Sequence, residues 1–192
     1  MTPPEAEVYN ELSDVVRMYA HENEINAGFL LATPQRMISS CLPAAVEHWR
    51  SRIADFEDED LTDEDNGEQT ASISPLVEKL AMRARFLPSP DELAENDSKF
   101  TRLLSVLDDF LKEHPDDKIV VFSTFRPTLR YLEKRLAAKN VPTLTIHGGV
   151  AERDEVLARF AEGREYRILL SSEVGSEGLD LQFCRALINY DL

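Results

Sequence analysis

Three short apolar runs in this chain are each followed at once by small polar residues or glycine, and such endings could bind a ligand. The run at residues 168–170 is typical of a strand buried on both faces of a parallel sheet. Ser171 and Ser172 follow it, and open α/β sheets bind their ligands at the carboxyl ends of strands. Gly175 and Gly178 come next, and residues without a Cβ let the backbone approach a ligand closely. This order predicts a strand followed by a ligand-binding loop.

The other two runs predict further strands of the same sheet. Residues 118–122 lead into Ser123, and residues 142–146 lead into His147. Apolar residues at helical spacing follow each run, namely Leu129, Leu132 and Leu136, then Val156, Leu157 and Phe160. Alternating strands and helices predict right-handed βαβ units on a parallel sheet, with one more strand at residues 186–188. The polar endings should then share one edge of the sheet.

Helices and a linker are expected before this α/β part. Thr2 and Glu5 have the spacing of a capping box, and two apolar stripes at helical spacing predict a helical connector over residues 1–54. An acidic flexible linker is expected over residues 55–72, and connecting helices over residues 73–117. The strongest of these helices should begin near Asp97 or Ser98, where either residue alone would serve as an N-cap.

The distribution of charge limits the function classes. Residues 55–68 hold nine acids and no base, and without them the net charge of −15 would be −6. From Lys118 onward, eleven Lys and Arg face ten Asp and Glu. That part lacks the basic stripe of an autonomous nucleic-acid binder, so any such contact must be local or shared with another domain. Cys41 and Cys184 lack metal-ligand spacing and are expected to be small buried residues, and no apolar run is long enough to span a membrane.

Longer strings identify a family. The string SSEVGSEGLDLQ with the later NYDL resembles motif V and its downstream strand in superfamily two helicases of the SWI/SNF type. Its Gly-Ser-Glu-Gly form looks most like the bacterial branch that includes the RNA-polymerase-recycling ATPase. The string VVFSTFRPTLRYL resembles motif IV, IHGG resembles the following His-Gly motif, and Asp-Ser-Lys at residues 97–99 resembles the entry to the second motor lobe. The resemblance implies an α/β fold: a partial RecA-like lobe at residues 118–192, with a parallel sheet and flanking helices, preceded by the helical connector.

The resemblance also implies site residues. Contacts to nucleic-acid phosphates would come from the three strand endings, through Ser123, Thr124, Phe125, Arg126, His147, Gly148, Ser171 and Ser172. Hydroxyls suit a strand that must be released at each step, because they donate to phosphate without a lysine's full charge. The ATP cleft would include Gly175, Glu177, Gly178 and Asp180, the last reaching a ribose hydroxyl. No catalytic residue and no metal ligand is expected in this chain itself.

By the same resemblance, the full protein would be an ATP-dependent DNA translocase in the cytoplasm, associated with the nucleoid. It would use ATP and Mg²⁺, track one strand of duplex DNA, pack against a first RecA-like lobe and act on RNA polymerase, without a membrane partner. The chain contains no G-x-x-x-x-G-K-[ST] loop and no Asp-Glu pair on a predicted strand, and motif VI would follow residue 192. Alone, the chain is therefore expected to hold neither ATP nor Mg²⁺ and to be inactive.

Two readings without a motor stay open. A Ser or Thr after a strand often only starts a turn or caps the next helix, and a lone His at a strand end is more often structural. The chain could also be a non-catalytic interaction module that binds a partner through the acidic linker and the N-terminal helices, with the α/β part as scaffold.

Overall fold

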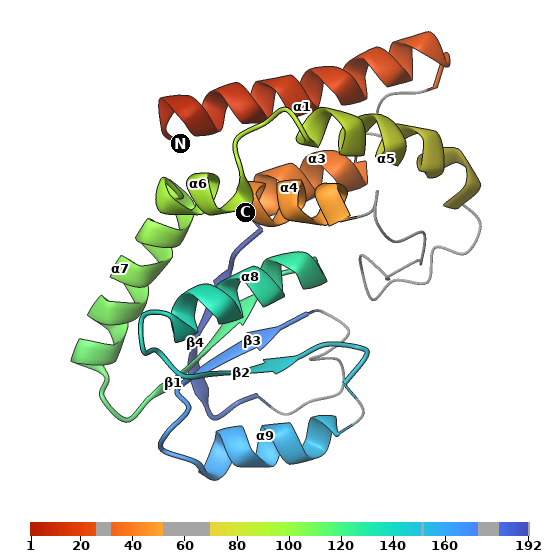
Figure 1. The fold of residues 1–192 in the computed structure, drawn as a ribbon. Coiled ribbons are helices and arrows are strands. Elements are labelled where there is room, and N and C mark those ends of the chain that lie inside the picture. Colours follow the sequence, from red (N-terminus) through yellow and green to blue (C-terminus); the bar gives the residue numbers. More distant parts are fainter. Residues whose placement is uncertain (26–31, 52–69, 151, 173–180, 192) are drawn as a thin grey trace. The chain divides into compact units, whose positions relative to one another are not determined.

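The computed structural model describes residues 1–25, 32–51, 70–150, 152–172 and 181–191. It contains two compact units, an N-terminal one that ends at Lys99 and a C-terminal one that begins at Phe100. The N-terminal unit is helical, and the C-terminal unit is a sheet with helices on its faces (Figure 1). The predicted α/β class, with a parallel sheet and flanking helices after a helical segment, is confirmed.

The N-terminal unit packs its helices around a core that includes Leu12, Val16 and Trp49, all at most 1% exposed. Its helices are α1 (Pro3–Glu22), α3 (Ala32–Ser40), α4 (Leu42–Ser51), α5 (Thr70–Ala84) and α6 (Pro90–Glu95), and α7 (Ser98–Glu113) begins in it. The second apolar stripe of the sequence is divided between α3 and α4. Pro43 lies in the first turn of α4, where its missing N–H removes no helical hydrogen bond. The helix expected near Pro75 begins earlier, at Thr70.

Glu5 joins the starts of two helices. The predicted capping box is confirmed, because Thr2 and Glu5 exchange side-chain and backbone hydrogen bonds. The Glu5 carboxylate also accepts the Ser98 backbone N–H at 2.8 Å and the Ser98 hydroxyl at 2.8 and 3.1 Å. Burial alone would raise the pKa of the Glu5 carboxyl, but the hydrogen bonds from Thr2 and Ser98 outweigh it and lower that pKa. Helix α7 therefore starts at Ser98, as predicted, with a carboxylate at its N-terminus.

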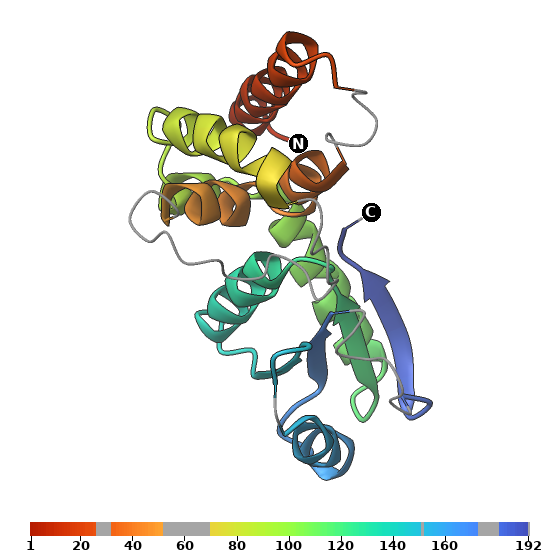
Figure 2. The same cartoon turned by 90° about the vertical axis from the view of Figure 1, so that its right-hand side faces the viewer.

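In the described residues of the C-terminal unit, four parallel strands form one sheet. They are β1 (Lys118–Phe122), β2 (Thr143–Ile146), β3 (Ile168–Ser171) and β4 (Cys184–Asn189), in the order β2-β3-β1-β4. Helix α8 (Arg126–Ala137) connects β1 to β2, and α9 (Arg153–Glu162) connects β2 to β3. Both connections predicted as strand, helix, strand are present, and Figure 2 shows the strands running side by side.

The two helices cover opposite faces of this sheet. Val120 and Leu169 are paired neighbours, and both pack with Phe160 of α9. Alternate residues of a strand point to opposite faces, so Val121 and Leu170 point to the face of α8. Each of these five side chains is at most 1% exposed. Burial on both faces explains why β1 and β3, the two central strands, are continuous apolar runs, whereas the edge strands β2 and β4 are less fully buried.

A half-buried lysine closes the end of α9. Lys118 Nζ donates to the carbonyl oxygens of Phe160, of Gly163 at 2.6 Å and of Tyr166 at 3.2 Å, and it lies 4.8 Å from the centre of the Phe160 ring. Burial lowers the pKa of Lys118 and raises the pKa of the neighbouring Cys184 thiol to about 11. The positive charge of Lys118 lies at the C-terminus of α9, and its three donated hydrogen bonds anchor that helix end to the first residue of β1.

Replacing Lys118 should destabilise the C-terminal unit. Lys118→Met keeps much of the apolar stem but removes the donor to three carbonyls, so we expect a loss of about 1–3 kcal/mol in the free energy of unfolding. Urea denaturation followed by circular dichroism measures it. Lys139→Met is the matched control, since Lys139 is exposed after α8. Equal midpoints for the two variants would contradict this role of Lys118.

Replacing Glu5 should change how stability depends on pH. A carboxyl with a lowered folded pKa stabilises the fold above its unfolded pKa, near 4.5, and loses that contribution as pH falls through the folded pKa. Glu5→Gln should therefore cost about 1–2 kcal/mol at pH 7 and flatten the loss of stability below pH 4.5. Thermal melts across that range measure both effects. Glu7→Gln, at an exposed position of the same helix, should keep the wild-type pH profile.

Candidate nucleic-acid interface

The polar strand endings lie along one edge of the sheet, as predicted. At the carboxyl ends, Phe122 pairs with Ser171 on one side and Asn189 on the other, and Ile146 pairs with Ser171. The ladder continues past the strands, since Ser123 N–H donates to the Ser171 carbonyl at 3.1 Å. The loops after β1, β2 and β3 therefore leave the sheet from neighbouring positions.

Ser123 does not face solvent at this edge. Its side chain is 1% exposed, and its hydroxyl donates to Asp191 Oδ1 at 2.8 Å. The other carboxylate oxygen of Asp191 accepts the Thr124 backbone N–H at 2.6 Å. Ser123 Oγ in turn accepts the Phe125 N–H at 3.3 Å, and Phe125 is 1% exposed. Ser123 and Phe125 thus hold the loop between β1 and α8 from inside, and of residues 123–125 only Thr124 is half-buried.

The two serines after β3 are also buried. Ser171 is 0% exposed and Ser172 is 1% exposed. The Ser171 hydroxyl donates to the Ser172 carbonyl at 3.0 Å, and the Ser172 N–H donates to the Ile146 carbonyl at 3.1 Å. Both residues belong to the framework of the edge. Their contact with phosphate stays a prediction.

Arg126, at the start of α8, and the His-Gly residues, in the loop after β2, lie close together. A Cβ built on Gly149 would lie 3.2 Å from the His147 ring and 3.6 Å from Arg126 Nη1. His147 Nδ1 accepts the Gly149 N–H at 3.1 Å, which turns the ring toward its own loop. Arg126, His147 and Gly148 are each half-buried, so part of each is open to a ligand. Only a glycine leaves this much room beside the guanidinium and the imidazole.

Two features at this point attract an anion. Arg126 is the first residue of α8, so its guanidinium lies near the partial positive charge of the helix N-terminus. Arg130 and Lys134 follow at intervals of four residues and are exposed. The acid on that side of α8, Glu133, accepts a hydrogen bond from the Thr145 hydroxyl at 3.0 Å. A cationic row thus extends from the sheet edge along α8.

The remaining sequence predictions concern the ATP cleft, metal binding, the cysteines and a membrane span. Gly175, Glu177, Gly178 and Asp180, predicted for the ATP cleft, lie outside the described residues. Within the described ranges, no group of three or more His, Cys, Asp or Glu residues could hold a metal ion. Neither cysteine forms a disulfide; Cys41 is buried and Cys184 half-buried. No helix in the described part of the chain is long and apolar enough to cross a membrane.

Asp191 is the site residue that the sequence reading missed. It contacts the loop after β1 from a position 67 residues further along the chain. Its position follows the pattern of the other strand endings: an apolar run at residues 186–188 is followed by Asn189, Tyr190 and Asp191. Its partner could not be found from the sequence, because the pairing of β4 with β1 decides it.

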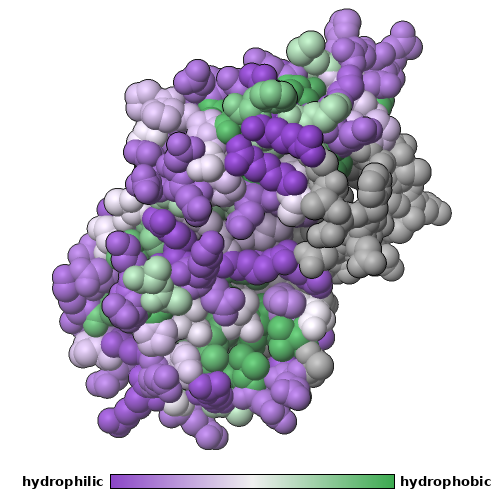
Figure 3. All heavy atoms as spheres, in the orientation of Figure 1, coloured by the Kyte–Doolittle hydropathy of each residue, from purple (hydrophilic) through white to green (hydrophobic). Residues whose placement is uncertain are grey.

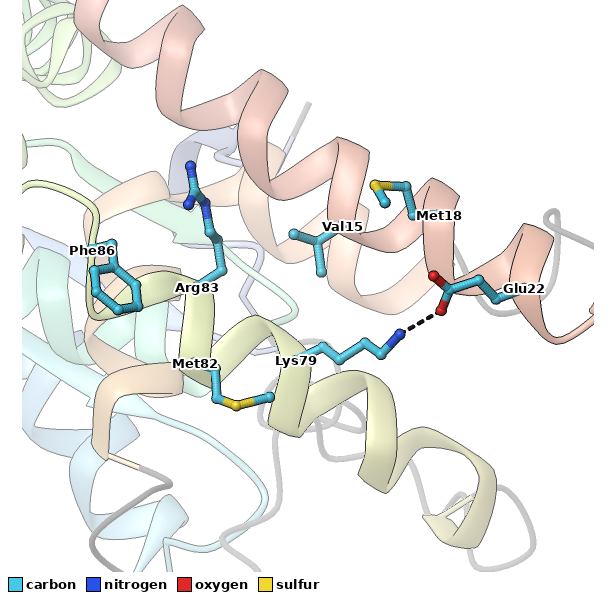
Figure 4. Close-up of a pocket in the computed structure, with 7 residues that line it drawn as sticks. All are labelled: Val15, Met18, Glu22, Lys79, Met82, Arg83 and Phe86. Carbon is cyan, nitrogen blue, oxygen red and sulfur yellow. Dashed lines mark hydrogen bonds and ion pairs between the residues drawn. The ribbon is translucent and has the colours of Figure 1, made fainter.

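A separate hollow lies in the N-terminal unit. A groove of about 310 Å³ between α1 and α5 is lined by Val15, Met18, Glu22, Lys79, Met82, Arg83 and Phe86 (Figure 4). Ion pairs cross between the helices, from Lys79 to Glu22 at 2.5 Å and from Arg83 to Glu11 at 2.6 Å. Figure 3 shows apolar side chains gathered over these helices on a mostly polar face. Phe86 is 80% exposed at one end.

The sequence of the C-terminal unit decides the family. Residues 98–192 match the family model of the helicase conserved C-terminal domain. This half of the chain is a helicase C-terminal domain. It forms the second RecA-like lobe of such proteins, and the α/β prediction for residues 118–192 falls inside it.

Relatives of the helicase C-terminal domain are named as ATP-dependent helicases. The uncharacterized ATP-dependent helicase YqhH of Bacillus subtilis is 26% identical over 192 residues, which is 100% of this chain and 30% of that protein. The ATP-dependent RNA helicase DBP2 of Candida albicans is 34% identical over 103 residues, covering 53% of this chain and 18% of that protein. The chain therefore spans less than a third of either relative.

Two solved structures share the fold. The Hef helicase domain of Pyrococcus furiosus matches with a TM-score of 0.55 and 18% identity, over 99% of this chain and 47% of that one. The C-terminal part of the Fun30 ATPase domain also matches with a TM-score of 0.55, at 15% identity, over 99% of this chain and 71% of that one. Identities this low show the fold alone.

Proposed function

We propose that this chain supplies the second motor lobe of an ATP-dependent helicase or translocase, and that its sheet edge contacts the phosphates of the tracked nucleic-acid strand. One observation carries the proposal: the Arg126 guanidinium lies beside the His147–Gly149 loop at the N-terminus of α8. A half-buried cation, a helix N-terminus and a glycine-containing loop together suit a phosphate group.

The roles within the interface follow from exposure. Arg126 would pair with a phosphate oxygen, and the half-buried Thr124 and Gly148 would border the same site. Ser123, Ser171 and Ser172 are buried, so we assign them to shaping the loops rather than to direct contact. Exposed Arg130 and Lys134 would attract the strand at longer range.

The wider protein would provide the ATP chemistry. The relatives are named ATP-dependent helicases, which supports use of ATP by the whole protein. By the motif resemblance, ATP would bind with Mg²⁺ between this lobe and a first RecA-like lobe. The predicted ATP-cleft residues fall outside the described part of the chain, so no step is assigned to nucleotide. The SWI/SNF type and action on RNA polymerase rest on the motif V resemblance.

Duplex DNA is the proposed track. The motif V string supports DNA, whereas DBP2 is named an RNA helicase. Phosphate recognition by Arg126 would serve either polymer, because the backbone charge is common to both. The binding experiment therefore measures RNA as well as DNA.

Removing the Arg126 charge should weaken binding to nucleic acid. Arg126→Gln should raise the Kd for a fluorescein-labelled DNA duplex about tenfold, since a charge-assisted hydrogen bond contributes about 1.5 kcal/mol. It should also lower the slope of log K against log salt by about 1. Fluorescence anisotropy measures both quantities, with an RNA duplex of the same sequence in parallel.

Arg164→Gln is the matched control for this charge change. Arg164 is exposed and precedes β3, at the amino edge of the sheet. Equal affinities and equal salt slopes for the two variants would refute the interface. Tighter binding of the RNA duplex, still weakened by Arg126→Gln, would keep the interface and replace DNA as the track.

The groove between α1 and α5 favours a second candidate function, a non-catalytic interaction module. Its lining includes two exposed methionines, Met18 at 62% and Met82 at 50%, and flexible thioethers suit apolar side chains of varied shape. The two candidates use different surfaces. Met82→Glu would change this groove, so an effect of that variant on DNA binding would count against the sheet edge as the main contact.

A further inference from the structure

The carboxylate of Asp191, just after β4, accepts two hydrogen bonds from the loop between β1 and α8. It accepts the Ser123 hydroxyl at 2.8 Å and the Thr124 backbone N–H at 2.6 Å. On its own side, the Asp191 N–H donates to Asn189 Oδ1 at 3.1 Å, and the Tyr190 N–H donates to the Phe122 carbonyl at 2.8 Å. We call the bonds from Asp191 to Ser123 and Thr124 the Asp191 clasp.

The clasp fixes the residues that lead into α8. Ser123 donates to Asp191 and also accepts the Phe125 N–H at 3.3 Å. One side chain therefore sets the backbone of residues 123–125, directly before Arg126. Helix α8 has no side-chain hydrogen bond at its N-cap, Phe125, so this loop lacks the usual local cap.

We propose that Asp191 is a positioning residue for Arg126, which keeps the guanidinium beside the His147–Gly149 loop. The proposal rests on the proposed function, in which Arg126 and the His147–Gly149 loop bind a phosphate. It gives Ser123 an indirect role: its hydroxyl transmits the position of Asp191 instead of touching phosphate. The end of one strand thereby determines where the helix after another strand begins.

A cation that leaves its place loses a phosphate contact even though its charge remains. Losing the clasp should therefore affect binding as losing Arg126 does, although Asp191→Ala makes the domain less acidic. Electrostatics alone would predict tighter binding for Asp191→Ala. The positioning role therefore predicts a higher Kd for Asp191→Ala, whereas electrostatics alone predicts a lower one.

A double-mutant cycle on the whole chain tests this. Anisotropy with the labelled DNA duplex would compare wild type, Asp191→Ala, Arg126→Gln and both together. We expect Asp191→Ala to weaken binding about fivefold and lower the salt slope, and the double variant to bind no more weakly than Arg126→Gln alone. Ser123→Ala should show a smaller change in the same direction, since it leaves the bond to Thr124.

Controls separate positioning from folding and from the proposed function. Glu162→Ala removes an exposed acid at the end of α9 and should not weaken binding. Thermal melts set the measuring temperature, at which every variant is folded. If Asp191→Ala lowers only the melting temperature, or if its effect on binding adds fully to that of Arg126→Gln, the positioning role is wrong. If Arg126→Gln itself has no effect, the proposed interface fails, whatever Asp191 does.

Discussion

The hydrogen-bond register of the four parallel strands is the constraint on which this molecule depends. Parallel pairing places Asn189, Phe122, Ser171 and Ile146 at the same level of the sheet. Each strand must then end in residues that can turn without steric conflict and satisfy their own polar groups. A shift of one residue in any strand would turn its apolar side chains from one helix to the other. Fold and interface are thus set by one pattern of pairing.

The same register explains why hydroxyls predicted at the surface are buried. The ladder continues one residue past the strands, through Ser123 and Ser172, so these residues still belong to the sheet interior. A small hydroxyl fits there because it can bond to a neighbouring carbonyl or carboxylate, as Ser171 and Ser123 do. The groups that a ligand can reach come one and three positions after Ser123, at Thr124 and Arg126.

The sequence was sufficient for most of the fold but not for these contacts. Strand β1 and helix α7 occupy the predicted residues, because β1 is a continuous apolar run, α7 has a strong helical period, and each has a polar or proline boundary. The capping box at Thr2 is local in the same sense. The bond between Asp191 and Thr124 joins residues far apart in the chain, and no local pattern reports it. The juxtaposition of Arg126 with Gly149 likewise requires that two crossovers end at one edge.

The near neutrality of residues 118–192 has a physical consequence for the interface. From Lys118 onward, basic residues exceed acidic ones by only one, so the general field attracts a polyanion little. Affinity must then come from short-range contacts. A displaced guanidinium would lose most of its contribution to binding. A strongly basic domain could tolerate a loosely held arginine, because the remaining charges would keep the strand in place. A nearly neutral one needs a structure such as the Asp191 clasp, even though the carboxylate adds a negative charge beside the phosphate site.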